Sequence, residues 1–268
     1  MRYLTITQRK RLKAIAHLGG LSRFRIYGNP GTMEGRKLGG LNSLKTHRRN
    51  DTGFILAKNF IKPRKSEKLA EFFGIIFGDG HLSSYQLSIT TNSGTDMEHA
   101  HYSMGLIRKL FELEARLKPR KTTMAVDVVV SSVRFVRWLN RLGMPIGNKL
   151  TKHLSVPPWI QKNDNFRKGF IRGLFDTDGC VYLDRHIIGG KKYENLGWTI
   201  TSYSDKLRGD ILKMLVDLGY RPTLKMSQKS VYLRRASDIR KYFVEIGSSN
   251  NKNLRRFKKF QGRVPKRS

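Results

Sequence analysis

Residues 69–81 read LAEFFGIIFGDGH, and a second stretch, residues 169–180, reads GFIRGLFDTDGC. Each is an apolar run of helix length that contains two glycines four residues apart and ends in Asp-Gly. Residues four apart share one face of a helix. Each run therefore predicts a helix with a flat glycine face, which lets the backbone of another helix approach closely. The fold is expected to be organised around these two helices, packed against each other.

Both helices are predicted to end at an acid, Asp79 in the first stretch and Asp178 in the second. The C-terminus of a helix already carries partial negative charge, so an acid is disfavoured there. Two acids at two adjacent helix ends predict a divalent cation, and hard oxygen ligands of this kind suit Mg²⁺. A single Asp-Gly after an apolar helix is an ordinary turn signal. The repetition of the whole pattern one small domain later favours the metal interpretation.

The two stretches resemble the LAGLIDADG motif of homing endonucleases, also called meganucleases, of the type with both motifs in one chain. Residues 173–179, GLFDTDG, match the family pattern GLIDADG, and residues 74–80, GIIFGDG, match it with Phe77 in place of the first Asp. That first Asp is not the metal ligand in the family. The resemblance covers residues 66–255 and implies an α+β fold of two pseudo-symmetric αββαββα repeats packed on paired LAGLIDADG helices, with curved antiparallel DNA-binding sheets.

The remaining pattern agrees with two repeats of helix, two strands, helix, two strands and helix. In the first half we expect strands over residues 81–91, 116–121 and 124–131, and helices from Thr95 (with Glu98 at capping-box spacing) and over residues 133–142. In the second half we expect strands near residues 181–187, 198–203, 223–226 and 230–234, and helices over residues 204–218 and 237–246. The expected domains are a basic N-terminal DNA-contacting extension (1–65), the first repeat (66–155), the second repeat (156–252) and a basic C-terminal tail (253–268).

The composition points to a nucleic-acid partner. The 53 Lys and Arg against 20 Asp and Glu give a formal net charge of +33, and phosphate neutralisation by such residues dominates nucleic-acid binding. The single cysteine, Cys180, excludes a disulfide framework and a cysteine zinc site, and suits a reducing compartment. The sequence has neither a membrane-spanning apolar run nor a secretion signal. We therefore expect a soluble protein of the cytoplasm or an organellar matrix, with no membrane partner.

The N-terminal residues read as a basic arm. Residues 7–17 suit a short helix, but glycines punctuate residues 19–40, so the arm is expected to track DNA and to become ordered on binding. Its expected DNA-binding residues are Arg36, Lys37, Lys45, Arg48 and Arg49. His99 and His101 are expected to be surface residues rather than metal ligands, because residues two apart do not share a helix face.

The resemblance also implies a set of active-site residues. Asp79 and Asp178 would bind the metal, helped by the main-chain carbonyls of Gly78 and Thr177. Mg²⁺ is the expected cofactor; Mn²⁺ or Ca²⁺ would occupy the same sites, Ca²⁺ without cleavage. The basic residues that the family carries beside this centre correspond best to Lys149 and Lys252, which would neutralise transition-state charge or orient water. In so basic a chain, the alternative for each lysine is an ordinary surface position.

Outward residues of the two sheets would read the DNA major groove, where base edges distinguish the base pairs. The candidates are Ser84, Gln86, Ser88 and Thr90 in the first half, Tyr182, Asp184, Arg185, Lys191, Lys192 and Tyr193 in the second, and Arg120, Lys121, Lys225, Gln228 and Arg234 on the later strands. The alternative for any one of them is a solvated strand face. Because the halves differ in these residues, the target should be long and asymmetric, and one chain should suffice as a monomer.

Three functions remain open at this point. The leading one is a site-specific double-strand DNA endonuclease, freestanding or intron-encoded, which hydrolyses phosphodiester bonds with divalent metal. The same fold also serves as an RNA maturase that assists intron splicing, with intron RNA as its partner, or as a DNA-binding regulator that does not cleave. Retention of both Asp79 and Asp178 favours cleavage.

Overall fold

The computed structural model describes residues 6–29, 31–50, 58–149, 154–224 and 229–262. The chain divides into two units, residues 1–56 and 57–268. Within the described ranges, no helix is both long and apolar enough to cross a lipid bilayer.

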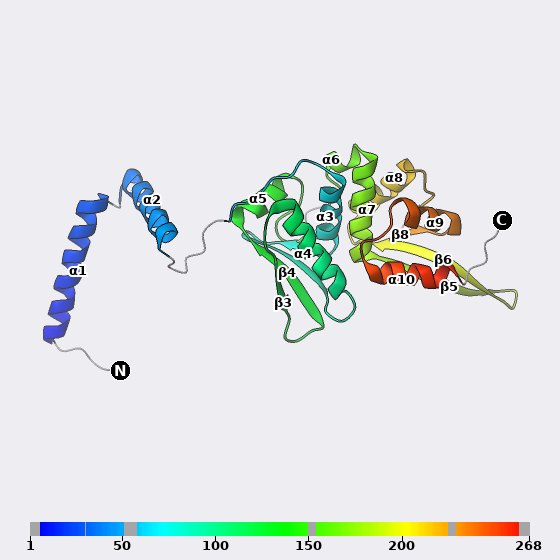
Figure 1. The fold of residues 1–268 in the computed structure, drawn as a ribbon, viewed down its shortest axis with the longest axis horizontal. Helices are drawn as coiled ribbons and strands as arrows, with labels where there is room; N and C mark the ends of the chain where they lie inside the picture. The colour runs from blue at the N-terminus through cyan, green and yellow to red at the C-terminus, as the bar shows by residue number, and fades with distance from the viewer. Residues whose placement is uncertain (1–5, 30, 51–57, 150–153, 225–228, 263–268) are drawn as a thin grey trace. The chain divides into compact units, whose positions relative to one another are not determined.

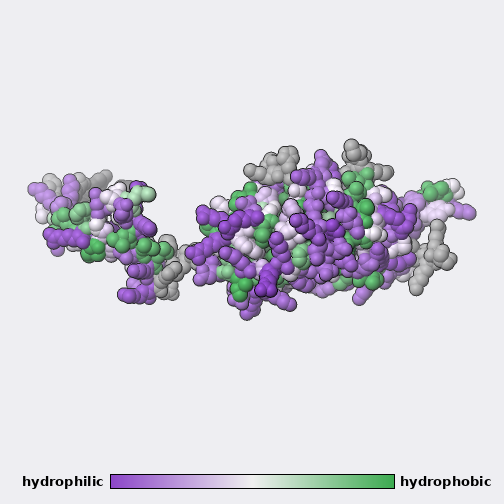
Figure 2. Space-filling view, turned by 90° about the horizontal axis from the view of Figure 1, so that it is seen from above, coloured by the Kyte–Doolittle hydropathy of each residue, from purple (hydrophilic) through white to green (hydrophobic). Residues whose placement is uncertain are grey.

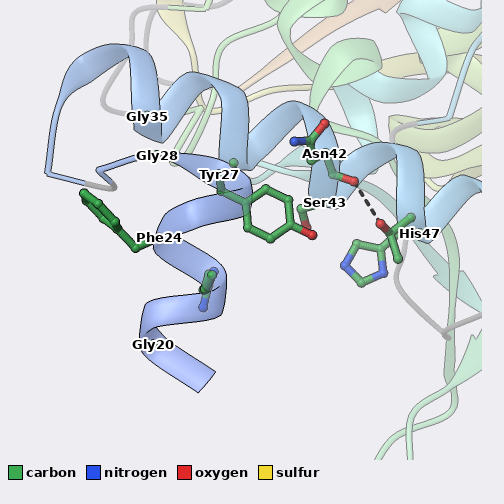
Figure 3. Close-up of a pocket in the computed structure, with 11 residues that line it drawn as sticks. Gly20, Phe24, Tyr27, Gly28, Gly35, Asn42, Ser43 and His47 are labelled. Carbon is green, nitrogen blue, oxygen red and sulfur yellow. Dashed lines mark hydrogen bonds between the residues drawn. The ribbon is translucent and has the colours of Figure 1, made fainter. Parts of the chain in front are cut away.

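Among the described residues of the first unit are two helices, α1 (Ile6–Tyr27) and α2 (Met33–Arg49). The expectation of an irregular arm broken by glycines is wrong here, because α1 continues through Gly19 and Gly20 and α2 through Gly39 and Gly40. A glycine costs about 1 kcal/mol in a helix, and the Leu, Lys and Arg residues around these pairs favour helix formation. The two helices line a cavity of about 770 Å³, whose walls include Phe24, Tyr27, Asn42, Ser43 and His47 (Figure 3).

The first repeat of the second unit follows the predicted order. It runs α3 (Glu67–Gly78), β1 (Gly80–Leu82), β2 (Gln86–Asn92), α4 (Met97–Phe111), β3 (Arg116–Pro119), β4 (Ala125–Ser131) and α5 (Val133–Arg141). Its four strands form an antiparallel sheet in the order β1-β2-β4-β3. In β4 the alternate residues Val126, Val128 and Val130 are buried, which is the period of a strand with one face on the core.

The second repeat has the same order of elements after a short helix, α6 (Pro158–Gln161). It runs α7 (Asp164–Asp178), β5 (Gly179–Ile188), β6 (Lys191–Thr201), α8 (Asp205–Asp217), β7 (Thr223–Leu224), β8 (Ser230–Leu233) and α9 (Ala236–Glu245), followed by α10 (Asn251–Gln261). Its sheet has the order β5-β6-β8-β7. The predicted α+β fold of two αββαββα repeats is confirmed.

Helices α3 and α7 lie side by side at the centre of this unit, with one sheet beyond each of them (Figure 1). The predicted glycine faces form their contact. A Cβ on Gly74 would overlap the carbonyl oxygen of Phe170 and lie 2.7 Å from the Leu174 nitrogen. A Cβ on Gly173 would overlap the carbonyl oxygen of Glu71. These separations are shorter than those that real Cβ atoms show. Only glycine at these positions therefore lets α3 and α7 approach each other this closely.

A buried ion-pair network also joins the two central helices. Glu71 of α3 is fully buried and accepts a hydrogen bond of 2.9 Å from Arg172 of α7. Ser249, which follows α9, donates to the same carboxylate at 2.6 Å. Burial raises the pKa of Glu71, but the charge of Arg172 and these hydrogen bonds outweigh it and leave the pKa lowered. The network therefore holds Glu71 ionised at the interface between the repeats.

Two details of α4 differ from the prediction. The helix begins at Met97 with Asp96 as its N-cap residue, so Thr95 and Glu98 do not form a capping box. His99 is 3% exposed rather than a surface residue, because it shares the buried face of α4 with Ser103 and Ile107. Burial lowers the pKa of His99 to about 4, so the ring is neutral at pH 7.

Candidate functional site

The two predicted acids lie at the ends of the paired helices. Asp79 is the C-cap residue of α3, and Asp178 is the last residue of α7. A Cβ added to Gly78 would lie 3.2 Å from the Asp178 carboxylate, and it would overlap the Thr177 side chain. Gly78 therefore lets Asp178 approach the end of α3, which brings the two acids together as the sequence predicted.

The electrostatics of the two acids differ from those of surface carboxylates. Burial and the charge of Asp178 raise the pKa of Asp79 to about 7, against the opposing charge of Lys149. Burial raises the pKa of Asp178 to about 6, again opposed by Lys149. Ionising both acids at two helix C-termini is thus unfavourable for the protein alone. A divalent cation held by these acids would offset this cost.

The donor set fits Mg²⁺ rather than a metal that needs a cage of protein ligands. In the described part of the chain, no group of three or more His, Cys, Asp or Glu side chains is arranged to hold a metal ion. Mg²⁺ is typically bound by one or two carboxylates and keeps water or substrate phosphates as its other ligands. Asp79, Asp178 and the main-chain carbonyls of Gly78 and Thr177 are the residues that would hold it.

Each acid borders its own cavity. The first chamber, of about 260 Å³, is lined by residues that include Asp79, Thr90, Thr91, Asn92, Asp96, Asp176, Thr177 and Lys252. The second chamber, of about 520 Å³, is lined by residues that include Asp178, Gly78, His81, Lys149, Thr201, Ser202, Tyr203 and Ser204. The two predicted lysines thus lie in different chambers, one with each acid.

Lys149 is bound to the end of α3. Its Nζ donates to the carbonyl oxygens of Phe77 at 2.9 Å and Gly78 at 2.5 Å. A helix C-terminus favours a cation. Burial lowers the pKa of Lys149, while the charges of Asp178 and Asp79 act in the other direction. Lys149 is therefore a partly buried cation beside the acids rather than a solvated surface lysine.

Lys252 has a different partner. Its Nζ lies 2.5 Å from Oδ1 and 2.7 Å from Oδ2 of Asp96. Sequence reasoning missed Asp96, since the residue before a helix is usually read as a cap and nothing in the pattern links it to Lys252.

Asp176, the first acid of GLFDTDG, was also missed as a lining residue. It accepts hydrogen bonds from the Ser248 hydroxyl and, at 2.8 Å, from the Ser249 nitrogen. Burial raises the pKa of Asp176 to about 7 against these hydrogen bonds. Asp176 thus links the segment after α9 to α7 through hydrogen bonds, next to the first chamber.

The DNA-reading candidates of the first sheet are only partly as predicted. Gln86, Ser88 and Thr90 lie on β2, on the side opposite the buried Leu87 and Ile89. Thr90 is engaged in a network, since its hydroxyl donates to Asp127 at 2.6 Å and Arg120 pairs with Asp127 at 2.9 Å. The prediction that Ser84 lies on a strand is wrong, because it lies in the turn between β1 and β2, and Arg120 and Lys121 directly follow β3.

In the second sheet, most candidates lie on the long β5–β6 hairpin. Tyr182, Asp184 and Arg185 are on β5, and Lys191, Lys192 and Tyr193 are on β6. Arg185 pairs with Glu194 at 2.7 Å. Arg234 directly follows β8 and packs 4.7 Å from the centre of the Tyr232 ring. Lys225 and Gln228 lie outside the described residues. The basic candidates of the first unit, Arg36, Lys37, Lys45, Arg48 and Arg49, all lie on α2.

The raised pKa values predict a pH-dependent stability. Above pH 7 the native state must ionise Asp79, whose folded pKa is about 7 against an ordinary 3.8. Protonated Asp79 therefore contributes its full stabilisation of the folded state below pH 4, and this stabilisation is lost as the pH rises through 7. In thermal unfolding without metal, Asp79→Asn should melt about 5 °C above the wild-type protein at pH 8, and the two should match at pH 4. Mg²⁺ at pH 8 should stabilise only the wild-type protein. Equal melting temperatures at pH 8 would contradict the raised pKa.

Comparison with known protein families shows that residues 165–260 match the LAGLIDADG-like domain family. Among solved structures, the I-LtrWI LAGLIDADG homing endonuclease bound to target DNA has a TM-score of 0.49 and 13% sequence identity. That alignment covers 73% of this chain and 89% of the other.

Curated relatives share only a segment with this chain. The replication factor C small subunit of Methanocaldococcus jannaschii is 26% identical over 200 residues, which are 71% of this chain and 10% of that protein. The tRNA-splicing ligase RtcB of Pyrococcus abyssi is 30% identical over 202 residues, 66% of this chain and 21% of that protein. The chain thus spans about a tenth to a fifth of these relatives. Because one segment matches proteins with unrelated names, those names do not indicate its activity.

Proposed function

Residues 165–260 form a LAGLIDADG-like domain, and from this premise we propose that the protein is a site-specific endonuclease that makes a double-strand break in DNA. The observation that carries the proposal is the pair of acids, Asp79 and Asp178, at the adjoining ends of α3 and α7. Each acid has a cavity and a lysine beside it. Two such chambers are the arrangement that cutting two strands requires.

Each group of residues in the proposed active site would have its own role in the reaction. Bound divalent metal, Mg²⁺ by preference, supplies Lewis acidity toward the phosphate and a hydrolytic water of lowered pKa. Asp79 and Asp178 would hold it, with the carbonyls of Gly78 and Thr177. The ammonium groups of Lys149 and Lys252 would neutralise the charge that develops on the phosphate or orient the attacking water. Because both acids and Lys149 are partly buried, these charges act more strongly than they would in bulk water.

The proposed partner is a long, asymmetric double-stranded DNA target, bound by one chain. Support comes from the net charge of +33 and from two sheets whose exposed residues differ. Helix α10 adds Arg255, Arg256, Lys258 and Lys259, which we assign to phosphate contacts, as we assign the basic residues of α2. On the face drawn in Figure 2, hydrophilic residues predominate over the second unit.

The interface is predicted to be strongly salt-dependent. A protein that neutralises many phosphates releases their counterions, so affinity falls steeply with added salt. If six or more phosphates are contacted, the dissociation constant should rise about 1,000-fold or more between 50 and 200 mM salt. Fluorescence anisotropy with a labelled duplex measures this. A nearly flat salt profile would contradict a phosphate-dominated interface.

The proposal is tested by exposing a randomised duplex library to the protein with Mg²⁺ and sequencing the cut ends, with Asp79→Asn/Asp178→Asn in parallel. The expected result is enrichment of one long asymmetric site with short 3′ overhangs, absent from the variant. A protein that enriches no site yet binds structured intron RNA tightly would be a maturase. One that binds a DNA site without cutting would be a regulator.

A further inference from the structure

The two chambers are built from corresponding parts of the two repeats. Each contains the acid that ends a central helix, residues at the end of a β-hairpin, the residue before the following helix, and a lysine. The first chamber takes these from α3, β2, Asp96 and Lys252, and the second from α7, β6, Ser204 and Lys149. The chambers can therefore be compared position by position.

One pair of corresponding positions differs in charge. Asp96 is the N-cap residue of α4, and Ser204 is the N-cap residue of α8. Ser204 behaves as an ordinary cap and accepts a hydrogen bond of 3.3 Å from the Leu207 nitrogen. Asp96 makes no side-chain cap bond, although a capping bond typically contributes about 1 kcal/mol to helix stability.

The carboxylate of Asp96 is directed to Lys252 instead. It pairs with the lysine at 2.5 and 2.7 Å. It also accepts from the Asn250 amide at 2.9 Å and from the Thr95 hydroxyl at 2.6 Å. The side chain of Asp96 is 9% exposed and that of Lys252 is 28% exposed. These three partners together hold the Asp96 carboxylate in place, and the carboxylate in turn restrains the ammonium group of Lys252.

Lys149 has no such partner. Among the residues that the structure describes, none of the ion pairs within 4.0 Å involves Lys149. Its ammonium donates to neutral carbonyls at the end of α3. Both lysines make charge-assisted hydrogen bonds, but only Lys252 is in direct contact with a full opposite charge, the carboxylate of Asp96. To reach a phosphate or a water, Lys252 must therefore leave a carboxylate partner, which Lys149 need not do.

We propose that Asp96 is a positioning residue that restrains Lys252, so that the two DNA strands are cut at unequal rates, the slower one from the first chamber. The proposal rests on the endonuclease function proposed above, and it assigns a role to a residue outside the predicted centre. A serine at this position, as in the second repeat, would leave Lys252 free to act as Lys149 does.

The test is a single-turnover cleavage assay with Mg²⁺ on the selected target duplex, each strand carrying its own label. In the wild-type protein one strand should be cut about tenfold faster than the other. Asp96→Ser should accelerate the slow strand by most of that factor and leave the fast strand unchanged. The reciprocal variant, Ser204→Asp, should slow only the fast strand. Glu114→Gln is the matched control, because it also removes a carboxylate that pairs with a basic residue, Arg108 of the same helix α4, but on the exposed surface.

Several outcomes would overturn the inference. Equal strand rates in the wild-type protein would do so, as would a slow strand that Asp96→Ser leaves unchanged or slows further. Asp96→Asn removes the charge with little change of shape, and it replaces the serine variant if thermal unfolding shows that the latter is poorly folded. A wild-type protein that cuts neither strand would contradict the proposed function itself, which separates the two failures.

Discussion

Asp79→Asn and Asp178→Asn should each reduce the single-turnover cleavage rate at the selected target by at least about 1,000-fold. The expected loss follows from the proposed metal site, in which each acid would supply a charge to the bound metal. Removing one electrostatic group from a preorganised site lowers the reaction rate about 100- to 1,000-fold, and loss of the metal would lower it further.

The same substitutions should change DNA binding much less than cleavage. The asparagine side chains nearly preserve the shape of the acids, and the proposed phosphate contacts lie on other residues. Affinity measured by anisotropy should therefore stay within about threefold of wild type, since one neutralised charge at the interface alters few contacts. Asp210→Asn is a suitable control, because Asp210 lies on α8 outside both chambers. Variants that cut at the wild-type rate would remove Asp79 and Asp178 from the active site.

Gly173→Val should strongly destabilise the folded protein. A Cβ at this position would overlap the carbonyl oxygen of Glu71 and lie 2.9 Å from the Ile75 nitrogen. Both are backbone atoms of α3, so neither can move without separating the two central helices. Forcing extra volume into a packed core typically lowers the free energy of unfolding by about 1–3 kcal/mol, occasionally more. The two methyl groups of valine would lie at a backbone contact, so we expect a loss at the upper end of this range.

Gly105→Ala provides the control for the glycine prediction. Gly105 lies within α4, and a Cβ there would meet no atom within 4 Å. Alanine should be neutral or stabilise the helix by up to about 1 kcal/mol. Urea unfolding followed by circular dichroism measures both variants. If Gly173→Val unfolds at the wild-type midpoint, α3 and α7 do not pack through their glycine faces.

The sequence was sufficient for the central helices and the first sheet because their signals are local and repeated. In the second sheet, the strand expected near residues 198–203 matches only the end of β6, which begins at Lys191. The four-residue glycine spacing in α3 and α7 specifies the contact that the structure contains. Alternation along residues 124–131 located β4 to within a residue. The two acids followed from the same motif, since a helix end and an Asp-Gly are read from neighbouring residues.

The sequence could not supply the partners of side chains that meet across long separations. Asp96 and Lys252 lie on different repeats, and only the packed fold brings them to 2.5 Å. The burial of His99 was not predictable, because the width of the buried face of α4 depends on the elements that pack there. The second half of α1 and the whole of α2 were missed for another reason. Glycine pairs suggest breaks, but flanking residues of high helix propensity allow a helix to continue through them.

The central claim is that Asp79 and Asp178 together form the divalent-cation site of a nuclease. Its most direct test is a titration of Mn²⁺ into the protein bound to its target duplex, followed by electron paramagnetic resonance, for wild type and Asp79→Asn/Asp178→Asn. The wild-type complex should remove free Mn²⁺ from solution, and the variant complex should do so no better than the duplex alone. Equal Mn²⁺ uptake by the two complexes would contradict the claim.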